Sequence, residues 1–228
     1  LFREPIGKLL AHLEAYENAD GLLENLPGWI FLEWSRANDR DVVCGVNYPT
    51  NMLYSVTLDA ASALYGDGRL AQKAERIRQA IRSQAFDGHF FVDNATRLAG
   101  ELRLTGNRTE VCQYYAFFTG TAAKASHPGL FETLMNDFGP QRKQTNLHPD
   151  IAFANAFIGN YLRMEVLRKE KRYAQMIREI RGYFLGMARR TGTLWEYDQE
   201  KASCNHGFAS YIACLLLEAK REGELRQV

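Results

Sequence analysis

One short segment of the chain combines a carboxylate with aromatic and polar side chains that could carry out acid–base chemistry. In residues 191–210, TGTLWEYDQEKASCNHGFAS, Glu196 directly follows Trp195, and Asn205 and His206 come shortly after. A carboxylate held beside a ring and an imidazole can take up or donate a proton at a bound molecule. The alternative is an ordinary solvated glutamate on a loop, and the rest of the chain has to separate the two interpretations.

Polar side chains also stand near the starts of other expected helices. Gln113 and His148 occupy such positions, as Asn205 and His206 do in the segment above. Helix capping explains many polar residues at helix starts, but these amides and imidazoles are harder to explain in that way. If the helices run parallel, these side chains converge at one end of the fold, together with the tryptophans and carboxylates of neighbouring loops. Such a cleft favours a carbohydrate, because rings stack on sugar faces and polar groups bind hydroxyls.

The elements that must position these residues are helices of two kinds. Amphipathic helices with one apolar stripe are expected at three places: 6–17, 69–86 and 167–184. Helices that are apolar nearly all round, and must be buried on every face, are expected at four places: 51–66, 112–123, 151–162 and 207–219. Their alternation predicts helical hairpins with inner helices inside an outer ring, which is an all-α toroid or α/α barrel.

Outside the helices, we expect short extended stretches that follow glycine turns: 29–34, 89–93 and 193–196. Other evidence for strands is thin. No linker or low-complexity segment divides the chain, so residues 1–228 are expected to form a single domain. The chain begins with Leu1 rather than Met, so a further N-terminal part is expected and the localisation stays open.

The composition is ordinary for a globular protein, with 46% hydrophobic and 24% charged residues. A net charge of +1 argues against nucleic acid as the main partner, because a polyanion would call for a basic surface. The longest apolar run, YIACLLLEA, is too short for a membrane span. The cysteines form no CxxC and no two histidines have the i, i+4 spacing of a metalloprotease, so neither a metal nor a cofactor is expected.

Five segments follow one another in a recognisable order: WIFLEW, NYPTNMLYSVTLDAASALYG, EVCQYYAFFTG, DIAFANAFIGNYL and TLWEYDQEKASCNHGFASYIACLL. This succession resembles the six-hairpin catalytic domain of α-L-rhamnosidases, glycoside hydrolase family 78, and similar layouts occur in other six-hairpin glycosidases. The resemblance covers nearly the whole chain. Its most specific element is the last one, in which T-x-W-E is followed by S-x-N-H at the start of a helix.

The resemblance implies an inverting glycosidase with two carboxyl groups, one that protonates the leaving oxygen and one that activates water. It implies that Glu196 is the general base, that His206 contacts the sugar and that Trp34 lines the pocket. The family usually has Asp where Glu33 stands. The expected substrate-binding residues are Trp34, Trp195, His206, Asn205, Gln113, His148 and Glu33.

The family's general acid lies upstream of its F-x-D-W element, and no matching segment precedes residues 31–34. The chain is therefore expected to be either a C-terminal portion of a longer enzyme or a degenerate, non-hydrolytic relative. Four or so hairpins are visible where six would close the ring, which favours the portion. Two alternatives to a hydrolase stay open: a non-catalytic carbohydrate-binding toroid, and a helical interaction scaffold in which these residues serve packing.

Overall fold

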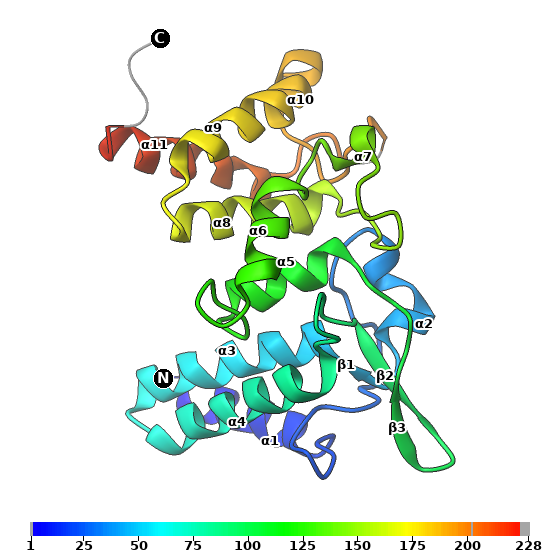
Figure 1. Ribbon diagram of the computed structural model, residues 1–228. Coiled ribbons are helices and arrows are strands. Elements are labelled where there is room, and N and C mark those ends of the chain that lie inside the picture. Colours follow the sequence, from blue (N-terminus) through cyan, green and yellow to red (C-terminus); the bar gives the residue numbers. More distant parts are fainter. Residues whose placement is uncertain (1, 202, 224–228) are drawn as a thin grey trace.

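Figure 1 shows the computed structural model, which describes residues 2–201 and 203–223 and is mostly helical, so the predicted all-α class is confirmed. Within these ranges, no helix is long and apolar enough to cross a membrane. The elements in chain order are α1 (Arg3–Glu14), η1 (Arg36–Asn38), α2 (Arg40–Val43), β1 (Val46–Asn47), α3 (Tyr48–Tyr65), α4 (Gly68–Ala85), β2 (Asn94–Leu98), β3 (Glu101–Leu104), α5 (Glu110–Phe118), α6 (Pro128–Asn136), α7 (Arg142–Thr145), η2 (Ala156–Asn160), α8 (Tyr161–Lys169), α9 (Tyr173–Gly182), α10 (Phe184–Thr191), η3 (Gly207–Ser210) and α11 (Tyr211–Arg221).

The helices pack in an inner row with other helices against it. α3 lies beside α5, α5 beside α8, and α8 beside α11, whereas α4 packs along α3 and α9 packs along α8 and α11 (Figure 1). The inner row therefore follows the order of the apolar segments in the sequence. The alternation of apolar and amphipathic helices predicts this arrangement, because each inner helix needs partners on more than one face.

The hairpin of α3 and α4 shows how local sequence sets the ends of helices. The Asn47 side chain accepts a hydrogen bond from the third residue of α3, and Gly66 ends that helix in the left-handed region at φ 68. The Asp67 side chain then accepts from the second residue of α4. The stripe of α4 that includes Ile77 and Ile81 is fully buried against α3. Caps and stripe together fix a hairpin whose helix ends the sequence predicts to within three residues.

Two of the expected helices are interrupted in the structure, and the expected helix 112–123 already ends at Phe118. The segment 151–162 is not one helix, because Phe157 has extended backbone angles and regular α-helix begins only at Tyr161. The backbone N–H groups of Asn155, Phe157 and Gly159 bond to distant parts of the chain. The segment 167–184 is likewise broken, at Lys171 with φ 54, so that its start belongs to α8 and residues 173–182 form α9, while Phe184 begins α10.

The inner helices are not buried on every face within the described residues, and this corrects the expectation from their composition. Ile212 and Leu215 of α11 are buried, but Leu217 is 57% exposed. An apolar groove of about 320 Å³ also runs over the inner row, from Leu53 of α3 to Tyr211 of α11. Apolar composition all round a helix therefore does not translate into complete burial in this part of the fold.

A small antiparallel sheet, with the order β1-β2-β3, was not expected. Val46 pairs with Ala95, and β2 and β3 form a hairpin whose turn residues Ala99 and Gly100 have φ values of 50 and 86. Such a turn favours Asn-Gly or Asp-Gly, so Ala-Gly is a weak signal. The stretches predicted as extended, 29–34, 89–93 and 193–196, are all outside helices, and apart from a single bridge at Phe91 they form no strands.

Candidate active site

Three parts of the chain that are far apart in the sequence meet at one place in the fold: 29–34, 155–160 and a third part made up of 194–201 and 203–206. The peptide groups of Phe157 join them, because its N–H donates to the Glu196 carbonyl at 2.9 Å and its carbonyl accepts from the Trp34 N–H at 3.3 Å. The Glu196 N–H donates to the Ser203 carbonyl at 3.0 Å, which folds the third segment back on itself. The irregular backbone at Phe157 thus places Trp34 and Glu196 side by side.

The carboxylate of Glu196 lies at the centre of this junction. The indole N–H of Trp34 donates to Glu196 Oε1 at 2.5 Å, and His206 Nε2 lies 3.8 Å from the same oxygen. The side chain of Glu196 is 14% exposed, and its Oε2 accepts no hydrogen bond from any described residue. His206 Nδ1 is buried and also has no partner in the described part of the chain. The carboxylate is therefore held at one oxygen, while the other is left for a ligand or water.

Half-buried aromatic rings surround the carboxylate. The Trp34 ring stacks on Tyr197 at a centroid distance of 5.8 Å and meets Phe31 edge-on at 4.8 Å. The Phe157 ring lies 4.9 Å from the His206 ring. A carboxylate with one free oxygen beside partly exposed rings is suited to a ligand that has both hydroxyl groups and an apolar face.

Glu33 precedes Trp34, but its carboxyl group bonds to the 155–160 segment and not to Glu196. It is fully buried, and its Oε1 accepts from the N–H groups of Asn155 and Gly159 at 2.7 and 2.8 Å. A Cβ atom at Gly159 would come within 2.2 Å of that oxygen, so the glycine permits the contact. Burial raises the pKa of Glu33 to about 8, which outweighs the opposing hydrogen bonds. Glu33 therefore holds the 155–160 turn as a neutral carboxyl group at neutral pH.

Two of the expected site residues lie in the core. Gln113 is fully buried, accepts from the Phe91 N–H at 2.9 Å and donates to the Phe91 carbonyl at 2.8 Å. Trp195 is 3% exposed, and its indole N–H donates to the Thr191 hydroxyl at 2.7 Å. The structure does not bring either side chain to the Glu196 junction, because both are used in packing and in tying backbone segments together.

The other two expected residues, His148 and Asn205, are at least partly exposed. His148 Nε2 is 2.8 Å from Asp137 Oδ2, and the imidazole packs against Phe138 rather than near Glu196. Asn205 is exposed, and its side chain makes no hydrogen bond within residues 2–201 and 203–223. Of the residues expected in one cleft, the structure brings Trp34, Glu196 and His206 together, with Asn205 next to them in the chain.

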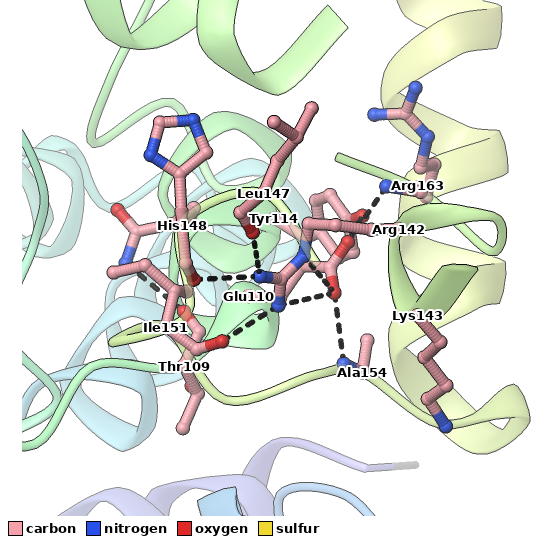
Figure 2. A network of polar contacts seen from close by, with 12 residues as sticks. Thr109, Glu110, Tyr114, Arg142, Lys143, Leu147, His148, Ile151, Ala154 and Arg163 are labelled. Carbon is pink, nitrogen blue, oxygen red and sulfur yellow. Dashed lines mark hydrogen bonds and ion pairs between the residues drawn. The ribbon is translucent and has the colours of Figure 1, made fainter. Parts of the chain in front are cut away.

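A second carboxylate, Glu110, lies in a buried network that sequence reasoning did not single out (Figure 2). It is 2% exposed and accepts from the Tyr114 hydroxyl at 2.5 Å, the Ala154 N–H at 3.0 Å and the Arg142 guanidinium at 3.2 Å. Arg142 donates in turn to three backbone carbonyls, those of Leu147, His148 and Ile151. In Figure 2 the His148 ring points away from Glu110, so only its backbone belongs to the network.

This network connects to the Glu196 junction through Asn155. The residue before it, Ala154, is held by Glu110, while the Asn155 side chain donates to the Trp34 carbonyl at 2.6 Å and accepts from the Asp198 N–H at 2.8 Å. Lys143 adds an ion pair to Asp198. The buried network thus fixes the backbone on which the accessible site is built.

No group of three or more histidine, cysteine, aspartate or glutamate side chains in the described ranges is arranged to hold a metal ion. Sequence reasoning missed the aromatic residues Phe31, Phe157 and Tyr197 as neighbours of Glu196. Tyr197 and Phe31 had a signal, since they stand in the WEY and WIFLEW segments. Phe157 had none, because its segment has the composition of a buried helix.

Comparison with known proteins shows the fold and no more than the fold. No protein-family model matches the chain, and no curated protein has significant sequence similarity to it. Among solved structures, the chain is similar to a GH78 family rhamnosidase of Bacillus sp. GL1, with a TM-score of 0.78 and 18% sequence identity. The match covers 96% of this chain but only 23% of the rhamnosidase chain. The described structure is thus related in fold to part of a glycoside hydrolase.

Proposed function

We propose that this chain is part of an inverting glycoside hydrolase, similar to an α-L-rhamnosidase, which removes terminal sugars from glycans with Glu196 as general base. One observation carries the proposal: the Glu196 carboxylate is held at Oε1 by the Trp34 indole and keeps Oε2 free beside half-buried rings. The fold likeness to a GH78 rhamnosidase supports the same reading.

In this proposal, Oε2 of Glu196 takes a proton from a water molecule whose oxygen attacks the anomeric carbon. The leaving oxygen receives its proton from a general acid on the opposite side of the sugar, in a further part of the same polypeptide. The base has to be ionised, and the N–H of Trp34 stabilises its negative charge. His206 and Asn205 are placed to bind sugar hydroxyls next to that carboxylate.

The test is Glu196→Gln in the full-length protein, because glutamine keeps the shape and removes the base. We expect hydrolysis of an aryl α-L-rhamnoside to fall by about 10²–10⁴-fold while binding is retained. Glu101→Gln, an exposed change in the β2–β3 hairpin, is the matched control and should leave the rate unchanged. Unchanged hydrolysis of aryl α-L-rhamnosides and of related aryl glycosides in Glu196→Gln would show that Glu196 is not the base.

The second candidate is a non-catalytic carbohydrate-binding domain, which the exposed aromatic side chains at the junction favour. In that case neither the unchanged protein nor Glu196→Gln hydrolyses glycosides, but both bind them. Binding and hydrolysis measured on the same set of glycosides therefore separate the two functions. A helical scaffold without a ligand would give neither binding nor hydrolysis.

A further inference from the structure

Trp29 is the most exposed large aromatic side chain near the Glu196 junction. It is 71% exposed, although its ring lies 5.3 Å from that of Phe31 and 5.8 Å from that of Trp34. Its indole N–H makes no hydrogen bond within the part of the chain that the structure describes. Most large aromatic side chains bury much of their surface, so a tryptophan left open beside other rings points to a ligand.

The contacts of Trp29 continue the site in one direction. Trp34, which donates to Glu196, contacts both Trp29 and Tyr197, at centroid distances of 5.8 Å in each case. The Tyr197 ring is covered further by the Lys201 ammonium group, 4.2 Å from its centroid. No described side chain covers Trp29 in a comparable way. In the row formed by Trp29, Trp34 and Tyr197, the Tyr197 end is therefore covered by Lys201, whereas the Trp29 end is exposed to solvent.

The backbone before Trp29 supports this orientation. Gly28 has a φ of 82, in the left-handed region, and a Cβ atom there would meet no atom within 4 Å. The glycine is therefore needed for the turn and not for close packing. The turn leaves Trp29 at the surface while the next residues lead inwards, so that Leu32 is 1% exposed.

We propose that Trp29 is a binding surface for a second ring of the substrate, one that has an apolar face and an oxygen able to accept the indole N–H. This inference rests on the proposed function. Because the proposed reaction removes a terminal sugar, any ring beyond that sugar belongs to the leaving group. The substrate class is then a glycoside whose leaving group carries a ring with an apolar face, either a sugar or a phenol, rather than a simple alkyl glycoside.

The test compares two glycosides of the same sugar in the full-length protein, phenyl α-L-rhamnoside and methyl α-L-rhamnoside. Trp29→Ala should weaken binding of the phenyl glycoside by about three- to tenfold and leave the methyl glycoside unchanged. Trp29→Phe should retain part of the effect. Leu98→Ala, which removes another exposed apolar side chain in the β2–β3 hairpin, should change neither. A rhamnosyl-glucose disaccharide then separates a sugar ring from an aromatic ring.

Equal losses for both glycosides, or a fall in melting temperature without selective loss of the phenyl glycoside, would overturn the inference, because Trp29 would then serve packing against another part of the protein. Binding is measured by calorimetry, with no need for hydrolysis. A selective loss in Trp29→Ala combined with unchanged hydrolysis in Glu196→Gln would refute the general base and retain the ring-binding surface. Lost hydrolysis in Glu196→Gln without a selective loss of phenyl glycoside binding in Trp29→Ala would refute the ring-binding surface and retain the general base.

Discussion

Glu110, at the start of α5, and Glu196, between α10 and η3, are two carboxylates that differ in how fully their oxygens are used. Glu110 is 2% exposed and accepts hydrogen bonds from Tyr114, Gly139, Arg142 and Ala154. Glu196 is 14% exposed, accepts from Trp34 and has a free oxygen. A buried charge with every hydrogen bond made fixes backbone, whereas a partly satisfied one at the surface can still act on a ligand.

The two regions are also unequal in what they hold in place. Glu110 and Arg142 bind the backbone of the loop that ends at Ala154. Asn155 continues that loop into the junction, where it bonds to Trp34 and Asp198. The buried glutamate therefore positions the accessible one, and the two should respond differently to the same substitution.

The largest difference is expected in stability. Glu110→Gln should lower the free energy of unfolding by about 3–5 kcal/mol, because it leaves the buried guanidinium of Arg142 without its counter-charge. Glu196→Gln should lower it by less than about 1 kcal/mol, since its partner is a neutral indole. Urea unfolding of both variants measures this. Adding Arg142→Met to Glu110→Gln should recover part of the lost free energy of unfolding. Equal losses for Glu110→Gln and Glu196→Gln would contradict the different roles of the two glutamates.

A second difference concerns pH. The pKa of Glu33 is raised from 4.5 to about 8 by burial, so the folded protein keeps a proton that the unfolded chain releases. The stability that this proton contributes is complete below about pH 4.5 and is lost as the pH rises through about 8. We expect a loss on the order of 2–4 kcal/mol across this range.

Glu33→Gln isolates that contribution, because glutamine keeps an oxygen for Asn155 and Gly159 but does not titrate. Asp93, with a pKa raised by burial to about 7, contributes a slope of the same sign in both proteins. The difference between the two stability curves therefore belongs to Glu33. Parallel curves between pH 4.5 and 8 would contradict a buried neutral carboxyl group at this position.

The smallest effect is expected for the donor to Glu196. Trp34→Phe keeps an aromatic ring and removes the N–H, and a hydrogen bond to a charged group contributes about 1.5–3 kcal/mol. The turnover number should fall by about ten- to hundredfold with little change in KM. Trp195→Phe is the matched control, since that indole bonds to Thr191 in the core and its loss should affect stability rather than rate. An unchanged turnover number in Trp34→Phe would place Trp34 outside the reaction.

Local rules predicted the α3–α4 hairpin well, because Asn47, Gly66 and Asp67 act within a few residues of where they stand. They failed for the segment 151–162, where apolar composition suits a helix. There the backbone N–H groups of Asn155 and Gly159 bond to Glu33, more than a hundred residues away along the chain. Composition does not contain such a partner, so the interruption of the helix could not be foreseen.

The sequence by itself determined the alternation of helices, the loop with Glu196 and His206, and the aromatic character of residues 29–34. Only the tertiary structure decided that the Trp34 indole donates to Glu196, 162 residues away in the sequence. It also decided that Glu33, the residue before Trp34, is fully buried against the 155–160 turn. It also decided that Gln113 and Trp195 are enclosed in the core. The physical reason is that periodicity fixes side-chain directions in helices, whereas in irregular segments the direction follows from long-range hydrogen bonds and packing.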